Sequence, residues 1–95
     1  MIGKECIIRT CNAGVHFGKV KESNGKIVVL ENAIRIWYWV GAASLSQLAM
    51  EGVKQPKECK FAMPVDTIEL TEAIEKIPCT PLAIENIRSV PSWKK

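Results

Sequence analysis

With 95 residues the chain is long enough for one domain, residues 1–95, and it buries only part of its apolar surface, so a second subunit would add stability. Hydrophobic residues make up 47% and charged residues 24%, as in soluble globular proteins, and no stretch approaches the roughly 20 apolar residues that cross a bilayer. The net charge of +3, with lysine and glutamate interleaved, argues against nucleic acid as a partner and leaves small anions as partners.

Strand-forming residues dominate the N-terminal half. Residues 1–5 lack the apolar core of an export signal, which predicts a cytoplasmic protein, and residues 5–11 are rich in β-branched side chains. Residues 15–21 and 26–30 flank Asn24-Gly25, a pair that predicts a hairpin with a tight type I′ turn. Glu31-Asn32 predicts another turn, so we expect an antiparallel meander that curls toward a small barrel.

The segment 34–44 holds three of the six aromatic residues, directly before a predicted helix. Read as a strand, it places Arg35, Trp37 and Trp39 on one face. Residues 44–47 have the S-x-x-Q form of a capping box, so a helix should begin there. Indoles stack on bases, whereas arginine and a helix N-terminus favour phosphate, so the segment predicts a nucleotide site. A core or a subunit interface is the alternative place for the tryptophans.

The C-terminal half combines two short helices with further strands. The first helix runs from Ser44 to about Glu51, residues 59–64 and 65–71 read as extended, and residues 72–77 fit a strand or a helical turn. Thr80-Pro81 begins a second helix whose inner stripe is Ala83, Ile87 and Val90, and Trp93 should anchor the tail. We therefore expect a small β-dominated α+β domain, a curled antiparallel sheet or small barrel with two short helices.

The four cysteines do not form a metal motif. Cys6, Cys11, Cys59 and Cys79 contain no C-x-x-C pair, and His16 is the only histidine. In a reducing compartment such thiols serve as small apolar side chains. We expect no metal and no cofactor.

Short motifs spread over nearly the whole chain resemble a family of small, uncharacterised proteins of tailed phages. They are Arg9-Thr10, Ala13-Gly14-Val15, Phe17-Gly18 and residues 35–39, 41–49, 51–53, 59–60, 74–78 and 90–93. By analogy with unrelated phage proteins of similar size, the resemblance implies an accessory role against host defence. The expected function is to bind and sequester a host nucleotide immune signal without turnover, in the host cytoplasm. That signal would be a cyclic ADP-ribose type, an ADP-ribose conjugate or a cyclic oligonucleotide.

The residues that we expect to hold this ligand come from two regions of the chain. We expect Trp37 or Trp39 to stack on a base, Arg9 and Arg35 to bind phosphate, Ser44 with the helix N-terminus to add a phosphate contact, and Thr10 and Asn12 to contact ribose or base. Each has a structural alternative: a solvated arginine, a turn or a helix cap. Nanomolar affinity, about −12 kcal/mol, exceeds what one shallow face provides, which favours a pocket in a homodimer or higher oligomer.

Three other classes of function fit the same sequence. A protein-interaction module could block a host defence effector and use the tryptophans as hot spots. A small-barrel nucleic-acid binder would need a continuous basic groove. An enzyme that degrades the signal would need a base or metal at the phosphate, and the only acidic cluster is Asp66, Glu69, Glu72 and Glu75. We expect no catalytic residues and no enzyme.

Overall fold

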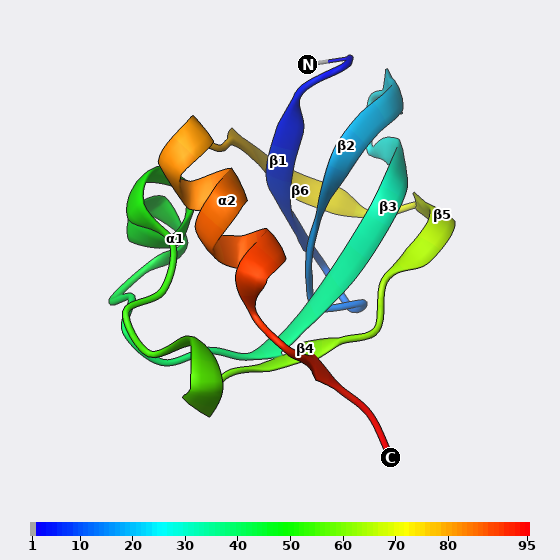
Figure 1. Cartoon of the computed structure of the whole chain (residues 1–95). Helices are drawn as coiled ribbons and strands as arrows, with labels where there is room; N and C mark the ends of the chain where they lie inside the picture. Colours follow the sequence, from blue (N-terminus) through cyan, green and yellow to red (C-terminus); the bar gives the residue numbers. More distant parts are fainter. Residues whose placement is uncertain (1) are drawn as a thin grey trace.

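The computed structural model describes residues 2–95 and contains a curled sheet with two short helices on one side of it (Figure 1). The prediction of a small β-dominated α+β fold is confirmed. Its elements in chain order are β1 (Glu5–Thr10), β2 (Val15–Asn24), β3 (Ile27–Tyr38), α1 (Leu45–Glu51), the short 3-10 helix η1 (Pro56–Glu58), β4 (Lys60–Ala62), β5 (Val65–Leu70), β6 (Ala73–Pro78), α2 (Pro81–Ser89) and β7 (Ser92–Trp93).

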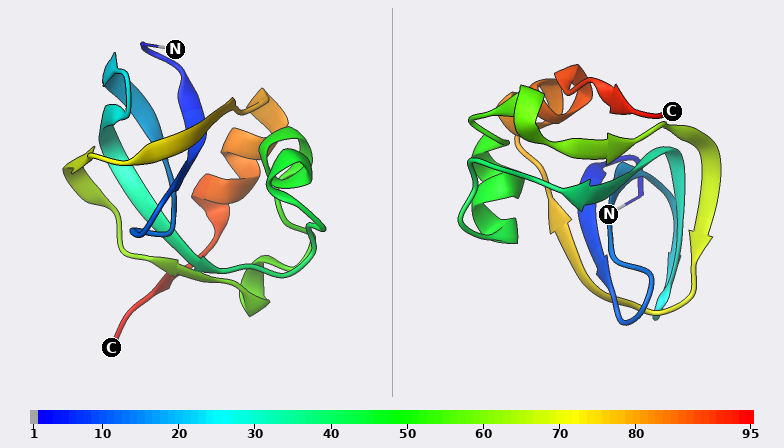
Figure 2. Two further views of the ribbon diagram at one scale, coloured as in Figure 1. Left: turned by 180° about the vertical axis from the view of Figure 1, so that it is seen from behind. Right: turned by 90° about the horizontal axis from the view of Figure 1, so that it is seen from below.

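The sheet curls because β5 and β6, which pair with different strands of it, are joined by a very short connection. The strand order is β6-β1-β2-β3-β4-β7, and β5 also pairs with β3. Only Thr71 and Glu72 separate β5 from β6, yet β5 pairs with β3 while β6 pairs with β1, so the sheet folds back on itself (Figure 2). The pair β4–β7 is parallel, so the sheet is mixed and not antiparallel throughout as expected. Residues 72–77, which the sequence left open, lie mainly in strand β6.

The predicted hairpin joins β2 and β3, with its turn one residue later than expected. Asn24 pairs with Ile27, so Gly25 and Lys26 form the two-residue loop. Gly25 has φ of 60°, whereas Lys26 does not have a positive φ. A positive φ at the first central residue alone is typical of a type II′ turn, which replaces the predicted type I′ turn.

The turn predicted at Glu31-Asn32 is wrong, because β3 continues through both residues. Asn32 instead has φ of 51°, and the register with β2 shifts between Phe17 and Lys19, as in a β-bulge. Asparagine tolerates this left-handed conformation better than most residues. The Arg88 guanidinium donates a hydrogen bond of 2.7 Å to the Asn32 carbonyl, so α2 holds the bulged strand in place.

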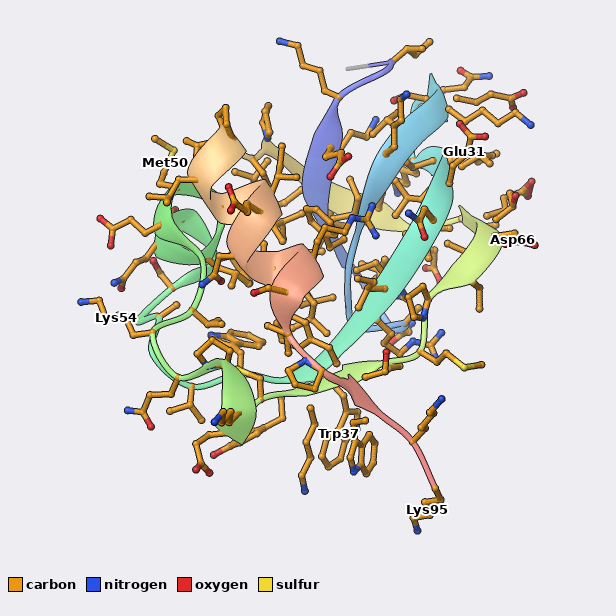
Figure 3. The ribbon with its side chains drawn as sticks, in the orientation of Figure 1. Glu31, Trp37, Met50, Lys54, Asp66 and Lys95 are labelled. Carbon is orange, nitrogen blue, oxygen red and sulfur yellow. The ribbon has the colours of Figure 1, made fainter. Side chains whose placement is uncertain are left out.

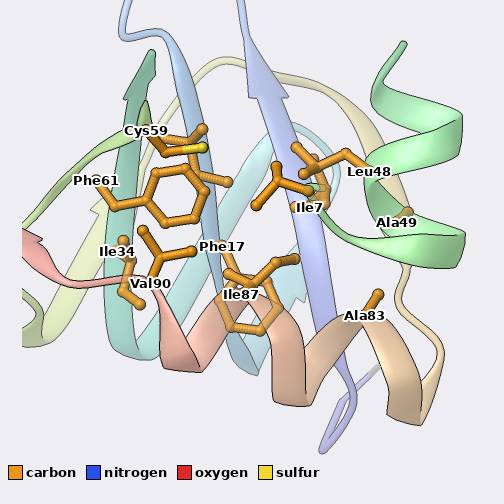
Figure 4. Close-up of a cluster of buried hydrophobic side chains, with 12 residues drawn as sticks. Ile7, Phe17, Ile34, Leu48, Ala49, Cys59, Phe61, Ala83, Ile87 and Val90 are labelled. Carbon is orange, nitrogen blue, oxygen red and sulfur yellow. The ribbon is translucent and has the colours of Figure 1, made fainter. Parts of the chain in front are cut away.

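Two apolar clusters lie on opposite faces of β1, β2 and β3. The helix-side cluster joins Ile7, Phe17 and Ile34 to α1 and α2 (Figure 4). It includes the predicted stripe Ala83, Ile87 and Val90, which is buried as expected. The inner cluster lies within the curl and joins Ile8, Leu30 and their neighbours to Leu70 of β5 and Ala73 of β6. Along β1, Ile7 and Ile8 alternate between the two clusters. Along β3, the bulge at Asn32 changes the face, so Leu30 packs in the inner cluster and Ile34 in the helix-side cluster.

Both helices begin at the predicted caps. The Ser44 hydroxyl accepts a hydrogen bond from the Gln47 N–H at 3.1 Å, and the Gln47 side chain accepts one from the Ala43 N–H at 2.7 Å. The Thr80 hydroxyl accepts from the Ala83 N–H at 3.1 Å. Neither helix, nor any other in residues 2–95, has the length and apolar character that a membrane crossing requires.

Candidate functional site

Trp37 and Trp39 do not lie on one face of a strand, so the expected alternation is wrong here. Opposite β4, Ile36 pairs with Phe61 and Tyr38 with Lys60, so Trp37 is an extra residue in β3. This irregularity leaves Trp37 and Tyr38 both exposed. Trp39 lies beyond the end of β3 and packs against the helix-side cluster. The two tryptophans that were expected to share a face therefore point into different environments.

Three of the predicted residues meet in one hollow, which we call the Arg9 hollow. Arg9 of β1, Trp39, Ser44 and Glu75 of β6 line an open space of about 410 Å³ together with Val15, Leu45, Ser46 and Ile77. The pairing of β1 with β6 sets Arg9 directly opposite Glu75. The Trp39 indole N–H donates to the Ala42 carbonyl at 3.3 Å, which fixes the ring at the rim.

The Arg9 hollow combines a cation, a carboxylate and an indole. The Arg9 Nε lies 2.6 Å from the Glu75 Oε1, and both side chains are about half exposed. Within residues 2–95, Glu75 is the only side chain paired with this guanidinium, so its two terminal nitrogens can still donate to an anion. The Ser44 hydroxyl is engaged as the cap of α1. A planar group and an anion are the ligand features that this arrangement fits.

Thr10 and Asn12 lie outside the Arg9 hollow. The Thr10 side chain is 6% exposed, and its hydroxyl donates to the Gly14 carbonyl and accepts from the Ala13 N–H, both at 2.8 Å. It therefore closes the turn between β1 and β2. Asn12 is exposed in the same turn. Neither side chain is among those that line the hollow with Trp39.

Arg35 lines a separate, smaller cavity of about 120 Å³ together with His16, Met63 and Val65. His16 is 1% exposed, and its Nε2 lies 2.9 Å from the Ala13 carbonyl oxygen. Burial lowers the pKa of His16, and the Arg35 cation opposite it in the β2–β3 register acts in the same direction. Sequence reasoning missed this cavity because its walls come from β2, β3 and the β4–β5 region, which lie far apart in the sequence, and no local motif marks them.

Trp37 stacks on Trp93, which confirms that Trp93 anchors the tail. The ring centroids are 5.1 Å apart at an interplanar angle of 17°. Strand β7 pairs with β4 and brings the two rings together. The Lys60 ammonium lies 5.2 Å from the Trp37 centroid and 5.4 Å from the Trp93 centroid. Figure 3 shows Trp37 outside the ribbon, on the side of the molecule where the tail leads to Lys95.

Two of the four thiols, Cys6 and Cys79, are poorly suited to nucleophilic chemistry. Burial raises the pKa of Cys79 to about 12, and burial also raises the pKa of Cys6. The thiolate is the reactive form, so both side chains favour the unreactive thiol at neutral pH. Among the described residues, no three His, Cys, Asp or Glu side chains come together in a group that could hold a metal ion.

Residues 3–87 match the family described as Domain of unknown function (DUF6948), and the chain therefore belongs to that family. Comparisons with curated proteins and with solved structures gave no match.

Proposed function

We propose that this member of DUF6948 binds a nucleotide in the Arg9 hollow and sequesters it without chemical turnover. The observation that carries the proposal is the meeting of Arg9, the Trp39 indole and Ser44 around about 410 Å³. Small-molecule sites occupy about 300–1,000 Å³, so the hollow is large enough for a nucleotide. Arg9 supplies donors for phosphate, and Trp39 supplies an aromatic face for a base.

The resemblance to small tailed-phage proteins supports the biological part of the proposal. In that role the protein acts in the host cytoplasm as an anti-defence sponge, which lowers the concentration of a nucleotide immune signal. The candidate signals are a cyclic ADP-ribose type, an ADP-ribose conjugate and a cyclic oligonucleotide. All three contain a base for Trp39 and phosphates for Arg9.

The energy that the hollow can supply favours an oligomer. One stacked base contributes about 1–3 kcal/mol and one charge-assisted phosphate contact about 1.5–3 kcal/mol. Their sum is well short of the roughly −12 kcal/mol that nanomolar binding requires. The hollow is open on the single chain, so a second copy of the chain can close it and add contacts. We therefore propose a homodimer or higher symmetric oligomer.

The ion pair between Arg9 and Glu75 is weak enough for an anionic ligand to replace it in the hollow. An ion pair between exposed groups contributes about 0–1 kcal/mol, so a phosphate can displace the Glu75 carboxylate at small cost. The same carboxylate repels phosphate as long as it stays beside Arg9. Neutralising Glu75 should therefore strengthen the binding of an anionic ligand, while removing Arg9 should weaken it.

The first experiment is native mass spectrometry of the protein with a panel of cyclic and linear adenine nucleotides, followed by heat release of whatever bound. An intact nucleotide at a fixed ratio per oligomer supports sequestration. A chemically altered nucleotide would show an enzyme, and a panel without any adduct would refute the nucleotide ligand.

Titration calorimetry of three variants with the nucleotide so found tests the site. Arg9→Ala should weaken binding about 10- to 150-fold, as expected for one charge-assisted contact, and Glu75→Gln should tighten it. Lys19→Ala removes an exposed cation from β2 and is the matched control. If Arg9→Ala and Lys19→Ala bind alike, the ligand lies elsewhere.

A further inference from the structure

The Trp37–Trp93 surface, formed by Trp37, Lys60, Trp93, Lys94 and Lys95, is a second place where aromatic and basic groups meet. Trp37 is 58% exposed and Trp93 is 43% exposed, although the two rings stack on each other. Exposed tryptophans at this level are uncommon on a surface that has no partner. The surface lies at the β4–β7 edge and shares no residue with the Arg9 hollow.

The Lys60 ammonium leaves the outer faces of the two indoles uncovered. The two centroids and the Lys60 ammonium form a nearly equilateral triangle with sides of 5.1, 5.2 and 5.4 Å. An ammonium beyond one ring along the stacking axis would lie much farther from the second centroid. Lys60 is therefore beside the pair, where it does not cover either outer face.

Positive charge concentrates at the same edge. The Lys60 ammonium lies close to both indoles, and Lys94 and Lys95 follow Trp93 directly in the chain. Lys60, Lys94 and Lys95 together carry a formal charge of +3, which equals the net charge of the whole chain. The net charge of the chain does not indicate this basic edge, because the lysines that form it lie far apart in the sequence.

We propose that the Trp37–Trp93 surface binds single-stranded nucleic acid, with a base stacked on an outer indole face and the flanking phosphates on the lysines. Base stacking on aromatic rings beside cations is how sequence-tolerant single-strand binders work. A second copy of the chain would bring a charge of +3 against +3, which disfavours self-association here. An acidic peptide would pair with the lysines but would leave the flat indole faces without a planar partner.

Fluorescence anisotropy with a labelled oligothymidylate of about 12 nucleotides tests the proposal, since single-strand sites span about 4–16 nucleotides. We expect saturable binding that is tighter than to a duplex of equal length. Because three lysines are placed to meet phosphates, the logarithmic salt slope should be about −2. Affinity should therefore fall about 20-fold between about 50 and 200 mM salt.

Matched variants separate stacking from charge. Trp93→Ala should weaken binding about 5- to 150-fold, the effect of one stacked base, and quench less tryptophan fluorescence on binding. Leu82→Ala removes an exposed apolar side chain from α2 and should bind as the wild type does. Lys94→Ala with Lys95→Ala should flatten the salt slope by about 1.4, at about 0.7 for each lysine, while the indole stack remains.

Three outcomes would overturn the proposal. They are no saturable binding of the oligothymidylate at low salt, equal affinity of Trp93→Ala and Leu82→Ala, or tighter binding of a polyglutamate peptide than of the oligonucleotide. The last would assign the surface to an acidic protein partner. Arg9→Ala should leave oligonucleotide binding unchanged, so the failure of this inference and the failure of the proposed nucleotide site are distinguishable.

Discussion

At the scale of single residues, the Asn86 side chain of α2 is hydrogen-bonded to the backbone of Val53, just beyond the end of α1. Its Oδ1 accepts from the Val53 N–H at 2.7 Å, and its Nδ2 donates to the Val53 carbonyl at 2.9 Å. Val53 is buried, so water cannot replace these bonds without rearrangement. A Cβ at Gly52, where φ is 78°, would overlap the Asn86 side chain, so the glycine allows the close approach.

Asn86→Ala should therefore lower the free energy of unfolding by about 2–4 kcal/mol, because it leaves two buried backbone groups without partners. Urea denaturation measures the loss. Glu85→Ala changes the exposed neighbour on the same helix and should alter stability by less than about 0.5 kcal/mol. Equal effects of the two substitutions would mean that the Val53 contacts are not formed in solution.

His16 should make stability depend on pH. Its pKa is lower in the folded chain than the ordinary 6.5, because burial disfavours the charged ring. Below pH 6.5 the unfolded chain binds a proton that the folded chain does not, so the free energy of unfolding decreases as the pH falls through this range. The decrease levels off once the pH is below the folded pKa.

Urea denaturation at a series of pH values checks this dependence. His16 is the only histidine, so His16→Gln should remove the decrease just below pH 6.5 while it lowers stability at every pH. An unchanged pH profile in the variant would assign the dependence to other groups.

At the scale of elements, Thr80 connects the start of α2 to the end of α1. Its hydroxyl caps α2 and donates to the Met50 carbonyl at 2.7 Å, and its backbone N–H donates to the Ala49 carbonyl at 3.0 Å. One residue thus satisfies groups at both helix ends, which sets the distance between the helices.

Thr80→Ala should cost about 1–2 kcal/mol of stability, the usual loss for an N-cap, whereas Thr80→Ser keeps the hydroxyl and should lose much less. Thermal denaturation followed by circular dichroism at 222 nm, the helix band, measures both. Thr71→Ala, in the exposed β5–β6 connection, is the control. Equal losses in the alanine and serine variants would show that the hydroxyl contributes nothing.

At the scale of the whole molecule, two cores share one sheet. Ile87 belongs to the helix-side cluster and Ile8 to the inner cluster, and the two clusters face opposite sides of β1–β3. Because β1 and β2 contribute to both, the clusters should unfold together as one cooperative unit. The expectation of a single domain over residues 1–95 depends on this cooperativity.

Ile8→Val and Ile87→Val should each lower the free energy of unfolding by about 0.5–1.5 kcal/mol, and the double variant should show nearly the sum. Both should shift the same transition when unfolding is followed by tryptophan fluorescence and by circular dichroism. Two separate transitions would mean that the clusters are independent units.

The sequence alone determined the features that depend on neighbours along the chain. The hairpin at Gly25, the caps Ser44 and Thr80 and the buried stripe of α2 follow from turn propensity, capping chemistry and periodicity, all of which act within a few residues. For the same reason the β-dominated α+β class with two helices could be predicted.

Only the tertiary structure decided where the candidate site residues lie. Bulges at Asn32 and Trp37 depend on pairing with β2 and β4, and no residue next to Trp37 signals that it turns away from Trp39. Arg9 meets Glu75 because β1 pairs with β6 across 66 residues, and Lys60 meets Trp93 because β4 pairs with β7. Strand register sets such contacts, and it results from packing of the whole chain.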